Sequence, residues 1–260
     1  MCFSDLMRGT ARMYFFKGKT FVQTTSILHN ADYGASNTFA TAYKGHRGYE
    51  LRIAPALTGT LNYTFAKHAG AGNETGTISG ADSVYLYQAQ SRLLKVLNWC
   101  EAAGCVPISA DRGYTLVKTA SATPTPATLA SGTQFEYPVG WADLSNATGA
   151  GIQIGSYQLA ATEMKSLEFN SGGADVRIGL WARQNSQPYY QTWPQWSINR
   201  AYVNFHASSV ASPNDEFLKS QHSLVILYDP PSPSGLRRAG CVFQKALRLR
   251  FSRSEETAHF

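Results

Sequence analysis

The stretch YELRIAPALTGTLNYTF, residues 49–65, holds two short runs in which apolar and polar residues alternate. The apolar positions are Tyr49, Leu51 and Ile53 in the first run and Leu61, Tyr63 and Phe65 in the second. Because successive side chains of a strand point to opposite faces, this period of two predicts two half-buried β-strands. Pro55 ends the first run, and we expect the two strands to pair as an antiparallel ribbon.

The composition of the whole chain favours the same class of structure. Of its 260 residues, 43% are hydrophobic and only 15% are charged, and glycine and aromatic residues are abundant. Such a composition suits many short strands joined by turns better than it suits charged helices. There is no apolar run of membrane-spanning length and no signal-peptide pattern at the start, so we expect a single unanchored, soluble domain.

Further segments extend the strand prediction along the chain. Residues 13–28 are predicted to form strand that turns or bulges at Gly18. Strand-like sequences follow in residues 134–144, 156–169, 174–184, 201–207 and 223–229. The last of these includes residues 223–228, an almost wholly apolar run that we expect to be a buried closing strand, ended by Pro230 and Pro231.

Three segments are predicted to be helical. Residues 91–104 have leucines at helical spacing and a glycine at the end, and they form the most convincing helix. A short helix is expected after a cap at Ser4, ending at Gly9, and a helical turn is expected around Phe39 to Tyr43. These helices are expected to lie in connections between strands.

Three other segments are expected to be loops. The glycine-rich residues 70–80 and the proline-containing residues 121–133 are predicted to be surface loops. Residues 184–196 combine aromatic residues with proline and are predicted to form a long loop that must pack its rings. The count is then about eight strands, which predicts an all-β fold: an eight-stranded antiparallel jelly-roll sandwich with one or two short helices in its connections.

The sequence contains no local catalytic or metal-binding motif. Its four cysteines and six histidines are scattered, without zinc spacing, and we expect reduced thiols and no bound metal or cofactor. Asp215 and Glu216 are the remaining candidates for acid–base chemistry. Adjacent strand residues point to opposite faces, so a turn with a solvated acidic pair is the competing interpretation.

Positive charge gathers at the end of the chain, which has a net charge of +6. We divide the chain into a jelly-roll domain, residues 1–233, and a basic tail, residues 234–260. A basic tail can contact nucleic acid, although a solvated end is an equally simple interpretation. The candidate RNA contacts are Arg237, Arg238, Lys245, Arg248, Arg250 and Arg253.

Three segments, taken in order, resemble motifs of the capsid proteins of picorna-like viruses, especially dicistroviruses and iflaviruses. FSDLMRGTARMYFF (residues 3–16) resembles the element before the first strand of the subunit around the five-fold axes. FATAYKGHRGYELRI (residues 39–53) resembles the helix and arginine-glycine strand of that fold. NDEFLKSQHSLVILYDPP (residues 214–231) resembles the close of the last strand. The matching residues are Tyr43, Arg47, Gly48, Leu51, Arg52, Asp215, Phe217, Pro230 and Pro231; residues 44–46 depart from the pattern, and Glu216 replaces an aspartate.

This resemblance implies a structural capsid protein and not an enzyme. It implies a jelly-roll subunit that assembles with sibling subunits and with copies of itself around an RNA genome. The protein would then be found in the virion, and in the host cytoplasm during assembly. In these families the acidic motif has been linked to maturation cleavage of a precursor, a role that would fall to Asp215 alone.

Two other functions remain open on the sequence. A jelly-roll carbohydrate-binding, lectin-like module is suggested by the aromatic residues Tyr189, Tyr190, Trp193 and Trp196. A hydrolytic enzyme would use Asp215 or Glu216 as its acid or base.

Overall fold

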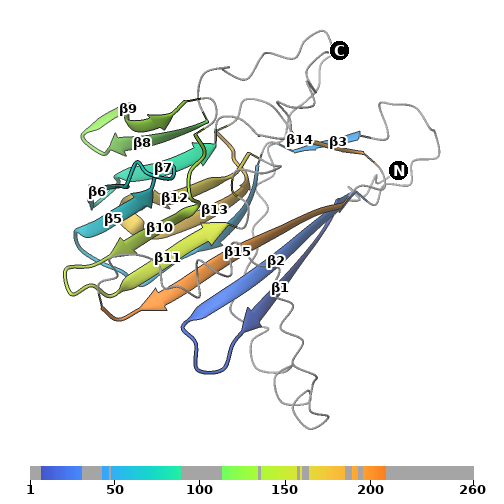
Figure 1. Ribbon diagram of the computed structural model, residues 1–260, viewed down its shortest axis with the longest axis horizontal. Coiled ribbons are helices and arrows are strands. Elements are labelled where there is room, and N and C mark those ends of the chain that lie inside the picture. The colour runs from blue at the N-terminus through green and yellow to red at the C-terminus, as the bar shows by residue number, and fades with distance from the viewer. Residues whose placement is uncertain are drawn as a thin grey trace.

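The computed structural model describes residues 7–30, 43–46, 48–88, 113–133, 136–156, 159, 164–184, 189–192 and 196–208. Within these residues the protein is all-β, as the alternating sequence predicts, and its strands form two large antiparallel sheets and one small one (Figure 1). The strands are β1 (Met7–Phe15), β2 (Phe21–Asn30), β3 (Tyr43–His46), β4 (Tyr49–Ile53), β5 (Leu61–Ala66), β6 (Asn73–Ile78), β7 (Ser83–Gln88), β8 (Tyr114–Ala120), β9 (Thr123–Gly132), β10 (Trp141–Ser145), β11 (Gly151–Ser156), β12 (Ser166–Asn170), β13 (Asp175–Trp181), β14 (Tyr189–Thr192) and β15 (Trp196–His206). A 3₁₀ turn, η1 (Ser171–Gly173), is the only helical element among the described residues.

The seven-stranded sheet has the order β1-β2-β15-β11-β10-β5-β6, and the six-stranded sheet has the order β4-β13-β12-β7-β8-β9. β14 and β3 pair as a separate two-stranded sheet. The two large sheets therefore hold thirteen strands between them. The prediction of eight strands was wrong because β7, β8 and β11 were not recognised, two expected loops contain β6 and β9, and an expected N-terminal helix overlaps β1.

The core lies between the two large sheets and contains the apolar positions that the alternation predicts. Tyr49 and Leu51 of β4 are buried, as are Leu61, Tyr63 and Phe65 of β5. Across the sandwich, the ring of Phe65 lies 5.1 Å from the ring of Phe169 in β12, measured between centroids. The two rings therefore join the seven-stranded sheet to the six-stranded sheet.

The pairing of β4 with β5 was predicted wrongly. β4 pairs with β13 at the edge of the six-stranded sheet, whereas β5 lies between β6 and β10 in the other sheet. The chain thus crosses from one sheet to the other after Pro55. Alternation shows only that each strand has one buried face. Pairing of β4 with β5 and pairing of β4 with β13 would bury the same residues, so the pattern does not distinguish them.

The glycine-rich residues 70–80 are not a loop throughout, because residues 73–78 form β6, which pairs with β5. Gly76 lies opposite Tyr63, and a Cβ at Gly76 would come 2.5 Å from the hydroxyl oxygen of Tyr63. Glycine is needed there because the tyrosine ring occupies the space of a side chain.

Residues 121–133 also differ from the prediction, since most of them form β9, the outer strand of the six-stranded sheet. Pro124 and Pro126 fit this position because an edge strand need not donate every backbone hydrogen bond. In the expected loop of residues 184–196, Tyr189–Thr192 form β14, which pairs with β3.

The N-terminal helix was also predicted wrongly over the described residues. β1 begins at Met7, and Gly9 pairs with Leu28 inside the β1–β2 ladder. The hairpin turn occurs at Gly18, whose φ of 73° suits glycine, as the sequence indicates. A helical turn was expected to end at Tyr43, but Tyr43 is the first residue of strand β3.

Several predictions fall outside the described residues: the helix of residues 91–104, the closing strand of residues 223–228, and the basic tail of residues 234–260. The described part of the fold includes no helix whose length and apolar character would let it cross a membrane.

Candidate functional site

The candidate residues named from the sequence are mostly not in the described part of the chain. Asp215 and Glu216 lie outside it, as do the six basic residues of the tail. Of the four aromatic residues, Tyr189 and Tyr190 belong to β14, Trp196 begins β15, and Trp193 lies outside the described residues. The chemistry proposed for these residues stays a prediction.

The structure instead brings together a charged cluster on the outward face of the six-stranded sheet, which we call the outward network. Its members are Glu50 and Arg52 of β4, Glu168 of β12, Asp175 and Arg177 of β13, and Arg183 just beyond β13. In the ladder, Arg52 pairs with Arg177 and Arg177 pairs with Glu168, so all three share one face. Their neighbours in sequence, including Leu51, Leu167 and Ile178, point into the core.

Glu168 is the centre of the outward network and has 0% of its surface exposed. Its Oε1 accepts hydrogen bonds from Ser166 Oγ and from Gln184 Nε2, both at 2.8 Å. Its Oε2 accepts from Arg183 Nη2 at 3.0 Å and from Asn170 Nδ2 at 3.3 Å. Four donors, one of them cationic, compensate the burial of this carboxylate.

The second half of the outward network surrounds Asp175. Arg52 donates from Nε and Nη2 to its two carboxylate oxygens, at 3.2 and 2.8 Å, and Arg177 Nε donates to Oδ2 at 2.8 Å. Burial opposes the charged form of Asp175, but these hydrogen bonds outweigh it and hold its pKa below the ordinary value. For Arg177, burial is likewise outweighed by the bonds to Asp175 and the nearby Glu50, and the pKa is raised.

Glu50 differs from the other carboxylates of the outward network. Burial raises its pKa, and the neighbouring charge of Glu168 adds to this effect, whereas Arg177, at 3.4 Å from Glu50 Oε1, opposes it. The pKa of Glu50 is thus shifted upward, in the direction opposite to that of Asp175 on the same face. The network as a whole presents a fixed array of paired charges across three strands.

A second polar cluster lies on the outward face of the seven-stranded sheet. His206 Nε2 of β15 lies 2.8 Å from Asp143 Oδ2 of β10, and its Nδ1 lies 2.7 Å from the carbonyl oxygen of Ser208. Burial lowers the pKa of His206, but the hydrogen bond and charge of Asp143 outweigh burial and raise it above the ordinary value. The pair ties the end of β15 to β10 across the intervening β11.

We expect this pair to make stability depend on pH. The pKa of His206 is higher in the folded protein than in the unfolded chain, where it is about 6.5. Its contribution is therefore complete below pH ~6.5 and is lost as the pH rises through the raised folded value. Urea unfolding at pH 6 and at pH 8.5 should show a larger loss of stability in the natural protein than in His206→Gln. Equal losses in the two proteins would contradict this assignment.

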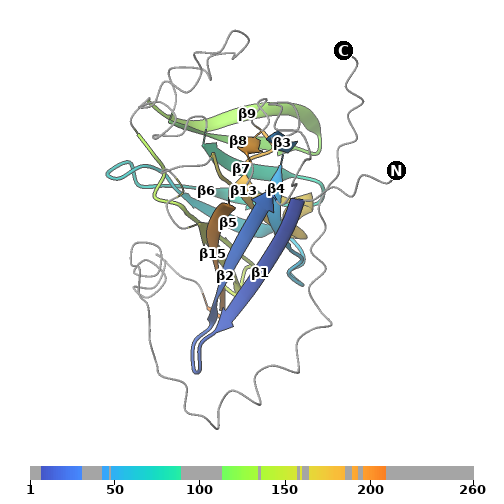
Figure 2. The ribbon, with the colours of Figure 1, turned by 90° about the vertical axis from the view of Figure 1, so that its right-hand side faces the viewer.

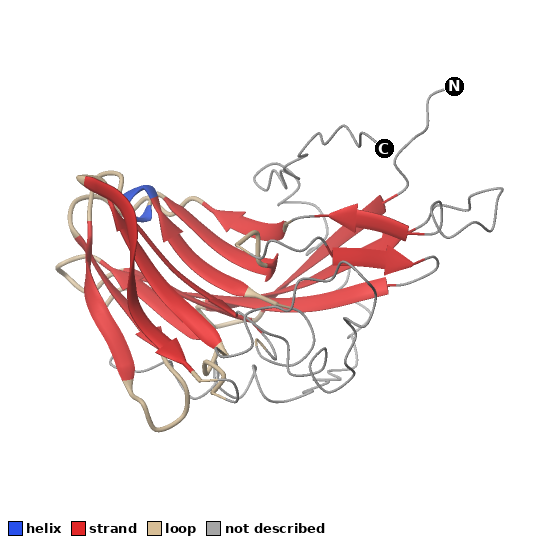
Figure 3. Ribbon diagram, turned by 90° about the horizontal axis from the view of Figure 1, so that it is seen from above, coloured by secondary structure: helices blue, strands red, loops and turns tan. Residues whose placement is uncertain are grey.

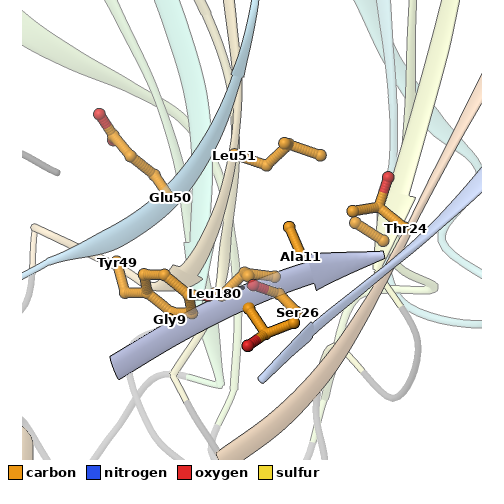
Figure 4. Close-up of a pocket in the computed structure, with 10 residues that line it drawn as sticks. Gly9, Ala11, Thr24, Ser26, Tyr49, Glu50, Leu51 and Leu180 are labelled. Atoms are coloured by element: carbon orange, nitrogen blue, oxygen red, sulfur yellow. Dashed lines mark hydrogen bonds between the residues drawn. The ribbon is translucent and has the colours of Figure 1, made fainter. Parts of the chain in front are cut away.

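A shallow pocket lies where β1 and β2 meet the edge strand β4 (Figure 4). Its floor is polar: the hydroxyls of Ser26 and Tyr49 are hydrogen-bonded, and Thr24 Oγ1 is buried without a hydrogen-bond partner among the described residues. Gly9 and Ala11 of β1 line the opposite side, and their small side chains leave the space. The pocket marks the place where the seven-stranded sheet reaches past the edge of the six-stranded one.

The sequence analysis missed the outward network, although a signal for it was present. Glu50 and Arg52 are two residues apart, as are Asp175 and Arg177, which places each pair on one face of a strand. Ser166 and Asn170 flank Glu168 on one face of β12 and carry the same signal, whereas Arg183 and Gln184 reach its carboxylate only after β12 and β13 have paired.

No protein-family model matches the chain, and no curated protein sequence is significantly similar to it.

Proposed function

We propose that this protein is a structural subunit that assembles with copies of itself and with sibling chains, and that the assembly is the icosahedral shell of a picorna-like virus. The proposal combines the motif resemblance of residues 3–16, 39–53 and 214–231 with two features of the structure. These are the order in which strands pair and the exposed apolar residues at one side of the sandwich.

The order of strand pairing supports a jelly roll. Four pairs are nested in the chain, β2 with β15, β4 with β13, β5 with β10 and β7 with β8. Successive pairs fall alternately in the seven-stranded and the six-stranded sheet, as in a long antiparallel ribbon wrapped around a core. β11 and β12 add one strand to each sheet between these pairs, and β1, β6 and β9 extend the edges.

The observation that carries the assembly function is the exposed apolar surface of the β1–β2 hairpin. Met13, Tyr14 and Phe15 are 38%, 42% and 61% exposed, and they alternate between the two faces of β1. Figure 2 shows this hairpin at one side of the sandwich, with its turn reaching beyond the other strands. Large apolar residues exposed on both faces of a projecting strand indicate a surface for protein–protein contact.

The test is to express the chain with and without its sibling chains and to image the product by negative-stain electron microscopy. Closed particles of uniform size are the expected result, and the proposed RNA contact of the six tail residues predicts that they contain RNA. A monomer under all salt conditions would contradict the proposal. If that monomer bound a glycan through Tyr85 and Tyr87, whose rings lie 6.1 Å apart beside Glu168, the carbohydrate-binding alternative would be supported.

A further inference from the structure

We propose that β1 is a self-pairing edge strand. Two copies of the protein would pair antiparallel through β1 about a two-fold axis at Met13, which joins their seven-stranded sheets into one continuous sheet. This interface deepens the assembly function proposed above and rests on it, since it names the surface through which two copies meet.

The four edge strands of the two large sheets differ in their ability to accept another strand. β9 contains Pro124 and Pro126, which lack a backbone donor, and the five-residue β4 carries the charges of Glu50 and Arg52. β6 is short and its sequence, NETGTI, is mostly polar. Proline, charge and shortness are the features by which proteins protect sheet edges from pairing.

β1 carries two charges, Arg8 and Arg12, but it has neither the prolines of β9 nor the shortness of β4 and β6. It is nine residues long, contains no proline, and is the outermost strand of its sheet in the part of the chain that the structure describes. Gly9, Thr10 and Ala11 line the pocket with β4, whereas the half of β1 from Met13 onward is exposed. We therefore place the exposed Met13 and Tyr14 against the second copy.

An antiparallel register centred on Met13 makes this segment complementary to itself. Met13 then faces Met13 of the second copy, and Arg12 faces Tyr14 of the second copy, where a guanidinium can lie against the ring. Ala11 faces Phe15, so a small side chain lies opposite a large one. Each of these contacts occurs twice because the interface is two-fold symmetric.

The projection of the hairpin leaves room for this pairing. β1 is the edge of the seven-stranded sheet, and Figure 3 shows that long strands project beyond the part of the structure where the sheets are layered. In two copies joined at β1, the six-stranded sheets would stay apart. The part of each seven-stranded sheet that projects beyond β4 would lie between them. Pairing through β4 would instead bring the two overhanging hairpins into collision.

The charges near the interface predict its dependence on salt. Arg12, Lys17 and Lys19 are all exposed and lie on β1 or in the turn that follows it. In the register centred on Met13, the two copies of Arg12 lie two residues apart along the paired strands, about 7 Å, so their repulsion opposes pairing until salt screens it. We therefore expect the dimer to tighten between about 0.05 and 0.5 M NaCl, the opposite of an interface with nucleic acid.

The register is tested with cysteine variants of the full chain under mild oxidation. Residues directly opposite in an antiparallel pair have Cα atoms about 4.5–5.5 Å apart, within the range of a disulfide. Met13→Cys is therefore expected to give a cross-linked dimer joined at residue 13, identified by mass spectrometry of the linked peptides. Ala11→Cys is the matched control, because the two copies of residue 11 would be about 13 Å apart.

Sedimentation velocity measures the same interface without cross-linking. Met13→Lys places two like charges opposite each other and should weaken the dimer at least ten-fold. Ile198→Lys, a change at an equally apolar residue that is 61% exposed on β15, should leave the dimer intact. Cross-linking at residue 11 in place of residue 13, or equal effects of the two lysine variants, would overturn the proposal.

The outcomes separate this interface from the shell function. Particles that assemble while residue 13 fails to cross-link would remove the β1 interface and leave the assembly function standing. Dimers that are cross-linked at residue 13 but never form particles would support the β1 interface and contradict the shell function. A monomer at high protein concentration and high salt would contradict the self-pairing of β1.

Discussion

Replacement of Phe169 by alanine is expected to lower the free energy of unfolding by about 3–5 kcal/mol. Phe169 is fully buried and its ring packs against that of Phe65 across the two sheets. Removing it leaves a cavity at the centre of the sandwich. β5 and β12 are each paired on both sides, so neither strand can move far to fill that cavity.

Urea unfolding followed by tryptophan fluorescence measures this loss. Phe169→Leu is the control, since it keeps most of the buried volume and should cost much less than alanine. Phe65→Ala should resemble Phe169→Ala, and the double variant should lose less than the sum of the two because both share one contact. If the loss in the double variant equalled the sum of the two single losses, the contact between the two rings would contribute nothing to stability.

Replacement of the neighbouring residue, Glu168, by alanine is expected to lower the free energy of unfolding for a different reason, by about 1–3 kcal/mol for each buried donor left without an acceptor. The side chain points to the opposite face and accepts four hydrogen bonds while fully buried. Without it, the donors on Ser166, Asn170 and Gln184 lose their acceptor. Unpaired buried donors are costly, whereas the lost attraction to the half-exposed Arg183 contributes little.

The matched control for this variant is Glu74→Ala. Glu74 is also a strand carboxylate, but it lies 3.6 Å from Lys67 at the surface, where an ion pair is worth about 1 kcal/mol or less. Glu168→Gln should fall between the two, because it keeps the volume and one acceptor oxygen. If Glu168→Ala and Glu74→Ala had equal unfolding midpoints, burial of Glu168 would contribute nothing to stability.

The sequence predicted the class of fold and the buried faces of several strands. β4 and β5 were predicted from their alternation, and the turn at Gly18 was predicted from its position between two strand-like runs. These features depend on residues close together in the chain. The all-β class, which follows from many such local patterns, was therefore accessible.

Two of the missed strands, β6 and β9, lack a local signal, whereas β11 has one in the alternation of Ile152 and Ile154 with Gln153. β6 and β9 contain the glycine and proline residues that normally mark loops, and they are strands because each lies at an edge beside a well-formed neighbour. The partner of each strand was also beyond local reasoning, since β4 and β5 bury the same residues whichever strand they join. The outward network shares this limitation because its members meet only after β4, β12 and β13 pair.

The pairing of β2 with β15 has a consequence for how the protein is made. Thr20 beside β2 and Asn204 in β15, which are hydrogen-bonded, are 184 residues apart in the chain. Contacts of such long sequence separation slow folding, because the chain must close a large loop before they form. During synthesis, β2 therefore lacks its partner β15 until β15 has left the ribosome. Its apolar residues stay exposed for that time, and we expect the nascent chain to bind chaperones.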